Sequence, residues 1–190
     1  GAPRCCIVVY DANAKRVIAE LDDVFGFNWS EDGEGVLYSS AVVDTQNNRN
    51  INRVHRFDWQ SEVNHTLYVY PDNAVFIGVS PAPKGGCFLG VKVNYGDTLM
   101  LYLNSEGKAT RLSSGKGFFE YIGEKNGRCY FSTDENAPMG HVLSIAAKDV
   151  EREGALVDGF AVALAETDAS LESVGLTDEG ILAVHSRNAC

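Results

Sequence analysis

The sequence of 190 residues has no long apolar run and no cluster of basic residues. A membrane-spanning helix needs roughly 18 or more consecutive apolar residues, and no run in this chain approaches that length, which predicts no membrane partner. The 16 Lys and Arg residues are scattered among 26 Asp and Glu residues, for a net charge of −10. A surface that binds nucleic acid needs clustered basic residues, so the composition also predicts no nucleic-acid partner.

Paired-cysteine motifs are absent as well. None of the five cysteines has Cys-x-x-Cys spacing, which excludes a zinc ribbon and a thioredoxin motif; they are Cys5, Cys6, Cys87, Cys129 and Cys190. Cys87 and Cys129 lie inside apolar strand patterns, where reduced and buried thiols are common. This cysteine usage predicts a reducing, cytoplasmic localisation.

Nucleophile and phosphate-binding motifs are missing too. An α/β-hydrolase needs Gly-x-Ser-x-Gly to expose its serine on a sharp turn, and the nearest fragment, Gly78-Val-Ser-Pro-Ala82, lacks the second glycine and carries a proline. A phosphate loop needs Gly-x-x-x-x-Gly-Lys-Ser/Thr ahead of a helix. Gly115-Lys-Gly117 instead precedes the strand-like Phe118-Phe-Glu-Tyr121, so we interpret it as a hairpin turn.

Metal-ligand spacing is also lacking. The four histidines follow no His-x-x-x-His or similar pattern and are interpreted as strand or surface residues; they are His55, His65, His141 and His185. The acidic pairs Asp22-Asp23 and Glu31-Asp32 have no EF-hand spacing and are interpreted as solvated turn residues. The sequence therefore predicts no catalytic residues, no cofactor-binding residues and no metal site in this chain.

What the sequence does contain is short strands separated by turns. The clearest case is Arg128–Ile145, in which the strand cores Cys129–Phe131 and Val142–Ile145 flank the polar turn Asp134–Gly140. Aromatic and β-branched residues favour strands, whereas Asp, Asn, Pro and Gly favour turns. By the same criteria we expect turns or loops at three further places, namely Asp44–Asn50, Gly123–Gly127 and Gly175–Gly180. The Ala- and Glu-rich segment Ala147–Ala169 is expected to be a loop followed by a strand, because Gly154, Asp158 and Gly159 interrupt it.

The strands recur in units. The last apolar residues before successive Gly-containing turns are Trp29, Val79, Ile122 and Val174, spaced by 50, 43 and 52 residues. Four short strands fit each period, and a β-propeller blade usually repeats after about 40–50 residues. The fold is therefore predicted to be all-β, a partial propeller; the alternative is an irregular sandwich whose turns are spaced by coincidence. No Gly-His and Trp-Asp signature of the WD40 type is present.

This period divides the chain into three complete four-stranded blades and two half-blades. The predicted domain is a single propeller fragment over residues 1–190, with blade units near 25–72, 73–115 and 116–168 and half-blades near 5–22 and 169–190. The first strand of each blade is expected nearest the central axis. A half-blade leaves an unpaired strand edge, and the absence of a starting Met fits a piece of a longer protein. We therefore expect the sequence to be cut from a larger propeller, with its edges completed within a compact ring or across a homodimer.

The strand-borne aromatic residues are expected to pack between blades. They are Phe27, Trp29, Tyr38, Phe88, Phe118, Phe119, Tyr121, Tyr130 and Phe131. This interpretation leaves them without a ligand-binding role.

Three elements together carry a family resemblance that spans nearly the whole chain. Phe27-Asn-Trp-Ser-Glu-Asp-Gly-Glu-Gly-Val-Leu-Tyr38 resembles the aromatic-x-Trp-x-x-Asp-Gly-x-Gly-x-x-Tyr element in the non-catalytic propeller of prolyl oligopeptidases. Arg53-Val-His-Arg-Phe57 and the segment Tyr130–Ile145 are similar to two later elements of that propeller, in the same order and at similar spacing.

The resemblance implies that this chain is part of the N-terminal propeller of a serine peptidase. In that family a propeller of about seven blades caps an α/β-hydrolase domain, restricts entry to short peptides and helps position them. The chain departs from the pattern because it has about half the blades and no hydrolase domain, so no catalytic residue can be carried over and no peptidase activity is expected from it alone. Whether the parent enzyme cleaves after proline or after basic residues is open. The alternative function is a stand-alone propeller that serves as a protein-interaction scaffold.

Overall fold

The computed structural model describes residues 5–152 and 159–187, which form 16 β-strands and two 3₁₀ turns. Cys190 and residues 153–158 of the expected loop-and-strand segment lie outside the described residues. The strands are β1 (Ile7–Asp11), β2 (Arg16–Leu21), β3 (Val24–Trp29), β4 (Gly35–Asp44), β5 (Arg49–Asp58), β6 (Val63–Val69), β7 (Phe76–Pro81), β8 (Cys87–Lys92), β9 (Thr98–Leu103), β10 (Ala109–Arg111), β11 (Phe119–Lys125), β12 (Arg128–Thr133), β13 (His141–Ala146), β14 (Ala161–Leu164), β15 (Ser170–Leu176) and β16 (Ile181–Ser186).

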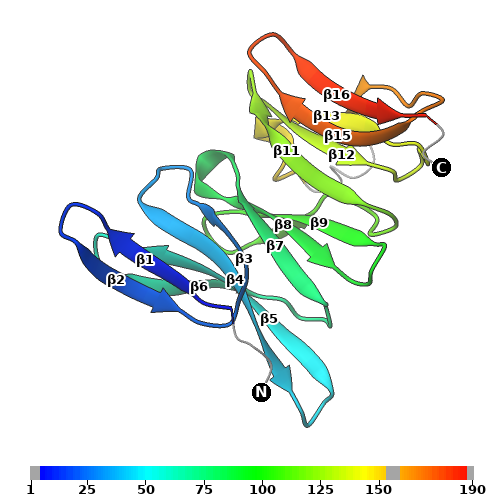
Figure 1. The fold of residues 1–190 in the computed structure, drawn as a ribbon. Coiled ribbons are helices and arrows are strands. Elements are labelled where there is room, and N and C mark those ends of the chain that lie inside the picture. The colour runs from blue at the N-terminus through cyan, green and yellow to red at the C-terminus, as the bar shows by residue number, and fades with distance from the viewer. Residues whose placement is uncertain (1–4, 153–158, 188–190) are drawn as a thin grey trace.

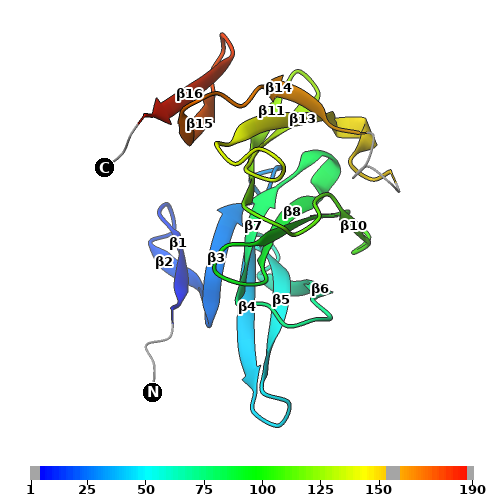
Figure 2. The same ribbon diagram turned by 90° about the vertical axis from the view of Figure 1, so that its right-hand side faces the viewer.

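The strands form five antiparallel sheets that follow one another along the chain. Three sheets have four strands each, β3–β6, β7–β10 and β11–β14, in sequence order, and β1–β2 and β15–β16 form two-stranded sheets at the ends. In Figure 1 the sheets run in an arc from the dark-blue β1–β2 hairpin to the red β15–β16 hairpin. Turned by 90°, the two terminal hairpins lie on the same side of the molecule (Figure 2). The predicted all-β partial propeller, with three complete blades and two half-blades, is confirmed.

The hairpin of β12 and β13 shows how the local sequence produces a blade. Cys129, Phe131 and Thr133 are buried, while the residues between them are partly exposed, as the two-residue period of a strand requires. Phe131 pairs with Leu143 across the ladder. The turn between the strands is closed by backbone hydrogen bonds from Ala137 N to Asp134 O and from Gly140 N to Ala137 O, of 3.0 and 2.7 Å. The turn expected at 134–140 is thus confirmed.

Other turns are shorter than expected, because strands continue into the polar residues. The prediction of a turn over Gly123–Gly127 is wrong: β11 continues to Lys125, past a bulge between Tyr121 and Gly123, and only Asn126 and Gly127 connect it to β12. Both residues have positive φ, 52° and 71°, the conformation that a two-residue type I′ hairpin needs and that Asn-Gly favours. Likewise β15 runs to Leu176, inside the turn expected at 175–180.

The loop expected over Asp44–Asn50 is confirmed only for its central residues 45–48. β4 extends to Asp44 and β5 begins at Arg49, and these two residues pair in the ladder and as an ion pair of 3.6 Å. Asp44 Oδ1 also accepts backbone hydrogen bonds from Gln46 and Asn47. A turn of four residues, 45–48, therefore connects the two strands. Polar composition here marks an exposed hairpin tip rather than an irregular loop.

Gly115-Lys-Gly117 is not the hairpin turn that its sequence suggested. It lies on the connection from β10 to β11, which belong to different sheets. Gly117 O accepts a hydrogen bond from Thr98 N at 2.8 Å, and Gly117 N donates to Asp97 Oδ1 at 2.7 Å. These hydrogen bonds therefore connect the start of the third blade to the beginning of β9 in the second blade.

In the segment expected to be a loop followed by a strand, the described part contains a 3₁₀ turn, Ala147–Asp149, and the strand β14. A second 3₁₀ turn, Pro83–Gly85, follows β7. In the described part of the chain, no helix is long and apolar enough to cross a membrane.

Three buried clusters hold the sheets together. One lies between the first and second four-stranded sheets and is mostly aliphatic, with Val54, Ile77 and Leu89 fully buried. A second joins the second and third sheets through aromatic rings, including Phe88 and Phe131. The third packs the β1–β2 hairpin on the first sheet. The core thus consists of seams between blades, as a radial arrangement of sheets requires.

Candidate functional surface on the inner strands

The first strands of the three four-stranded sheets and of the β15–β16 hairpin lie on one common inner surface. β3 contacts β7, and β11 contacts both the second sheet and β15. Each of these strands begins a sheet whose later strands lie successively farther out, so their side chains are the ones available at the centre of the arc. We call β3, β7, β11 and β15 the inner strands.

A cavity of about 530 Å³ separates β11 from β15. Its wall includes three carboxylates, Glu120, Glu172 and Asp134, and no Lys or Arg. Asp134 Oδ1 accepts a hydrogen bond from Phe118 N at 2.6 Å, and Glu172 Oε1 accepts one from Ser186 Oγ at 2.5 Å. Burial raises the pKa of Tyr121, which also lines the cavity, so its phenol stays a hydrogen-bond donor. The cavity is suited to groups that donate hydrogen bonds or carry positive charge.

A second, apolar hollow of about 310 Å³ lies where β3, β7 and β11 meet. Phe27, Phe76 and Phe118 contribute rings to it. Lys92 Nζ lies 5.2 Å from the centroid of the Phe118 ring and 2.6 Å from Thr98 Oγ1, so its ammonium is held at the edge of the hollow. Glu120 and Tyr121 line both spaces, so the ring-lined hollow and the acidic cavity are adjoining parts of one inner surface.

The aromatic residues divide into two groups, which corrects the expectation that all of them pack between blades. Phe88, Phe119 and Phe131 are buried, but Phe27 and Trp29 are each 61% exposed. Phe25, Phe27 and Trp29 alternate along β3 with less hydrophobic residues, so successive rings emerge on one face of the strand. These exposed rings are available for binding.

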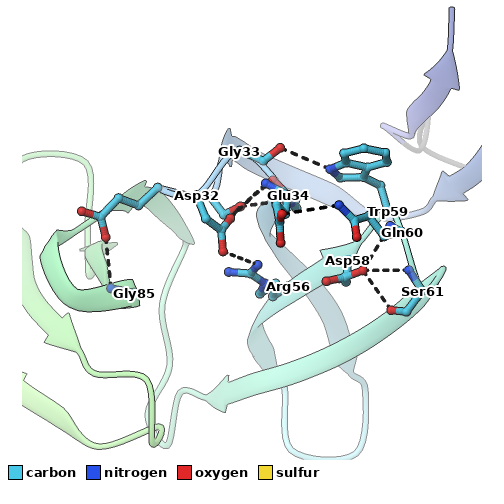
Figure 3. Close-up of polar contacts among 12 residues, drawn as sticks. Asp32, Gly33, Glu34, Arg56, Asp58, Trp59, Gln60, Ser61 and Gly85 are labelled. Atoms are coloured by element: carbon cyan, nitrogen blue, oxygen red, sulfur yellow. Dashed lines mark hydrogen bonds and ion pairs between the residues drawn. The ribbon is translucent and has the colours of Figure 1, made fainter. Parts of the chain in front are cut away.

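The turn between β3 and β4 carries the densest polar cluster (Figure 3). Asp32 accepts hydrogen bonds from Ser30 Oγ at 2.6 Å, Glu34 N at 3.0 Å and Arg56 at 2.7 Å. The hydrogen bond from Ser30, followed by those from Arg56 and the backbone, holds the pKa of Asp32 well below its usual range. Glu31 reaches the second sheet, where Gly85 N donates to its carboxylate at 3.1 Å. The acidic pair Glu31-Asp32 is therefore bound to protein groups and is not merely solvated.

Gly35 is required in this turn because there is no space for a side chain. A Cβ at this position would lie 2.8 Å from Phe57 O and 3.3 Å from Arg56 Nε. Gly35 N in turn donates to the buried Ser30 Oγ at 2.9 Å. The Ser-Glu-Asp-Gly-Glu-Gly sequence thus encodes a rigid turn, and its role is to position β3 and β4 rather than to carry out chemistry.

Two of the cysteines, Cys87 and Cys129, are poor nucleophiles in this fold. Burial raises the pKa of Cys87 to about 12 and that of Cys129 to about 12, so both remain protonated thiols. Cys5 and Cys6 are exposed, and all four are free.

The histidines are spread over four strands, β5, β6, β13 and β16. His55 is buried, stacks on Tyr38 with ring centroids 4.7 Å apart, and is 2.9 Å from Ser40 Oγ. Among residues 5–152 and 159–187, no group of three or more His, Cys, Asp and Glu side chains is arranged to hold a metal ion. That this chain has no catalytic or ligand-holding residues stays a prediction.

Sequence reasoning did not single out Glu120 and Glu172. Each lies two residues before one of the recurring apolar residues, Ile122 or Val174, but the matching position of the second sheet is Ile77, which is fully buried. The repeat spacing alone therefore does not identify exposed positions on the inner surface.

This arrangement is that of part of a β-propeller, with successive four-stranded sheets whose first strands form an inner wall. No protein-family model matches the sequence, and no curated protein matches it.

Solved structures of prolyl oligopeptidases share the fold. A prolyl endopeptidase is 15% identical, with a TM-score of 0.69 over 93% of this chain and 27% of that chain. Prolyl oligopeptidase B from Galerina marginata, as the apo protein, is 18% identical, with a TM-score of 0.67 over 90% of this chain and 26% of its own. The same enzyme bound to a 35mer hydrolysis and macrocyclization substrate gives 17% identity and a TM-score of 0.70. The chain therefore spans about a quarter of the length of these structures.

Proposed function

We propose that this chain is the non-catalytic propeller portion of a prolyl oligopeptidase-like serine peptidase. The observation that carries the proposal is the shared fold over nine-tenths of the chain with prolyl oligopeptidases, of whose length it covers about a quarter. The three sequence elements that resemble that family's propeller support it independently of the fold.

In this proposal the inner strands contact short peptides and restrict which of them reach a hydrolase domain on the same parent chain. The acidic cavity between β11 and β15 accepts donors of the peptide backbone and its amino terminus, while the rings of Phe27, Phe76 and Phe118 contact apolar side chains. The chain itself positions peptides and does not cleave them.

The proposed organisation is a single propeller fragment over residues 1–190, with units near 25–72, 73–115 and 116–168 and half-blades near 5–22 and 169–190. We place the protein in a reducing, cytoplasmic compartment, because Cys87 and Cys129 are free and buried in separate sheets.

The coding sequence beyond Cys190 tests this function most simply. The expected result is an open frame with Gly-x-Ser-x-Gly a few hundred residues downstream, and a stop codon directly after Cys190 would overturn it. A proline-containing fluorogenic peptide should not be hydrolysed by this chain alone. Turnover that survives purification to homogeneity would refute the non-catalytic assignment.

A stand-alone interaction scaffold is the second candidate, and the terminal hairpins favour it. Among the described residues, β1 pairs only with β2 and β16 only with β15. The side chains of Tyr10, Leu182 and Val184 on these hairpins are more than half exposed. Unpaired edges with apolar side chains are templates for another strand. Placing β16 beside β1 of a second copy would complete a four-stranded sheet. Sedimentation equilibrium that gives a monomer at all concentrations would exclude this homodimer.

A further inference from the structure

A cavity of about 310 Å³ lies between the β1–β2 hairpin and the turns of the first four-stranded sheet. Three aromatic side chains from three different elements line it: Tyr10 of β1, Trp29 at the end of β3 and Trp59 directly after β5. They are 56%, 61% and 37% exposed. Rings such as Phe88 and Phe131 contact one another in the core, but these three line an open space.

The walls of the cavity are fixed by hydrogen bonds. Trp59 Nε1 donates to Gly33 O at 3.2 Å, and Trp59 N donates to Glu34 O at 3.3 Å; Figure 3 shows the indole held against this turn. The hairpin is joined to the same sheet by the ion pair between Arg16 and Glu62, at 2.7 Å. A preformed site loses little conformational entropy when a ligand binds.

Charge at the cavity favours a cation. Asp11 lines it, and its Oδ1 accepts the turn hydrogen bonds of Asn13 N and Ala14 N at 2.8 and 2.9 Å, which hold the carboxylate in place. The nearby Arg16 is matched by Glu62. Among the described residues, the cation–π contact is that of Lys92 with Phe118. No Lys or Arg of the described chain therefore covers the rings of this cavity.

We propose that Tyr10, Trp29, Trp59 and Asp11 form an aromatic cage that binds a trimethylated, quaternary ammonium group. The faces of Trp and Tyr carry negative potential and attract cations, Trp most strongly, and quaternary ammonium groups are recognised in this way. Such a group has no N–H to satisfy, so a wall of rings and one carboxylate complements it fully. This group comes either from a free quaternary amine or from a trimethylated lysine side chain.

The first test uses the fluorescence of the two tryptophans of the chain, Trp29 and Trp59, both of which line the cavity. Choline at constant ionic strength is expected to change their emission saturably. The neutral isostere 3,3-dimethylbutan-1-ol is expected to bind at least about tenfold more weakly, since it lacks the charge that the rings attract. Equal binding of both compounds, or no binding of choline, would overturn the proposal.

Variants locate the site by calorimetric titration of choline. Trp59→Leu is expected to weaken binding about tenfold or more. Asp11→Asn is expected to weaken it several-fold, because the substitution removes the charge but keeps a side-chain oxygen that can accept the turn hydrogen bonds. Phe25→Leu is the matched control: this ring lies on the same strand as Trp29, is 58% exposed and is outside the cavity. Circular dichroism verifies that each variant folds. If Phe25→Leu weakens binding as much as Trp59→Leu, or if folded Asp11→Asn binds unchanged, the cage is wrong.

A final arm distinguishes the two sources of the ligand. A ten-residue peptide with one trimethyllysine is compared with the same peptide carrying unmodified lysine, and with choline. Tighter binding of the trimethylated peptide than of choline identifies a modified lysine as the ligand, and equal binding identifies a free quaternary amine. Preference for the unmodified lysine peptide would contradict the cage.

Discussion

The two seams between the four-stranded sheets are built in different ways. At the first seam, between β3–β6 and β7–β10, the buried residues are mostly aliphatic. Polar side chains reach the backbone across this seam: Ser39 Oγ donates to Ile77 O, and Asn52 Nδ2 donates to Ala74 O at 3.0 Å. At the second seam, between β7–β10 and β11–β14, rings fill the space. Phe88 meets Phe131 edge-on at 5.2 Å and Tyr121 at 4.4 Å.

The difference shows that blades of one fold can be joined by polar ties to the backbone or by packed aromatic rings. At the first seam, hydrogen bonds from Ser39 and Asn52 cross between sheets whose shared core is mostly aliphatic. At the second seam, large rings fill the core. Substitutions should therefore affect the seams differently: removal of a ring damages the second seam, and loss of a polar tie damages the first.

The largest effect is expected from Phe131→Ala at the second seam. Phe131 is fully buried and contacts the rings of Phe88, Phe119, Tyr121 and Phe160. Truncation of a core phenylalanine lowers the free energy of unfolding by about 3–5 kcal/mol. Urea denaturation measures this loss in the free energy of unfolding. Tyr95→Ala, at a fully exposed residue, is the control. A loss below about 1 kcal/mol, within the range of an ordinary surface substitution, would show that the rings do not hold this seam.

The next largest effect is expected from Gly35→Ala, in the turn that reaches the first seam. The added methyl would meet Phe57 O at 2.8 Å, and such overpacking costs about 1–3 kcal/mol. Gly180→Ala is the matched control, since its Cβ would have no neighbour within 4 Å. Equal denaturation midpoints for the two variants would contradict the close packing of this turn.

Ser39→Ala tests the polar tie of the first seam directly. Ser39 is 1% exposed, so its loss removes a buried hydrogen bond and leaves Ile77 O without this donor, at about 1–2 kcal/mol. Ser61→Ala serves as the comparison, because its hydrogen bond to Asp58 is exposed. The polar account of the first seam fails if both variants unfold at the same urea concentration.

A pH dependence is expected from the first sheet. Burial, and to a smaller extent Arg53, lowers the pKa of His55, so the folded chain keeps this imidazole neutral where the unfolded chain protonates it. Because the folded pKa is depressed, stability is full above the unfolded pKa of about 6.5 and falls as the pH drops toward the folded pKa. Burial also lowers the pKa of His141, which adds to the same slope.

His55→Gln should therefore reduce the loss of stability between about pH 7 and pH 5. The matched variant is His65→Gln, at an exposed position of β6, which should keep the slope of the unaltered chain. Denaturant midpoints at each pH give the measurement. A slope unchanged in His55→Gln would assign the pH dependence elsewhere.

The smallest effect is expected from Asp32→Asn. The ion pair of Asp32 with Arg56 is half exposed on the aspartate side, so its removal should cost below about 1 kcal/mol at neutral pH. Because the pKa of Asp32 is lowered, its contribution is present above the unfolded pKa of about 3.9 and is lost as the pH falls through the lower folded value. A cost that persists unchanged near pH 2 would show that the carboxylate charge is not involved.

The number and order of blades were predictable from the sequence because apolar residues recur near the ends of the first strands, at Trp29, Val79, Ile122 and Val174. Strand ends were less predictable, since polar residues such as Asp44 and Arg49 pair across an exposed hairpin where composition suggests a loop. Asn126-Gly127 carried a specific hairpin signal that a broader count of turn residues obscured.

The candidate surfaces were less predictable than the fold. Burial of Phe88 and exposure of Phe27 depend on which neighbouring blade faces each strand, and no local pattern contains this information. The same holds for Tyr10, Trp29 and Trp59, which come from two strands and a turn and meet only once the hairpin packs on the first sheet.

The central claim is that the inner strands contact peptides without cleaving them. The direct measurement is a ¹H–¹⁵N correlation spectrum of the labelled chain titrated with a short proline-containing peptide. The account predicts saturable shifts concentrated on β3, β7, β11 and β15, around Phe27, Glu120 and Glu172, with the peptide intact at the end. Shifts confined to the outer strands β6, β10 and β14, or none at saturating peptide, would contradict it.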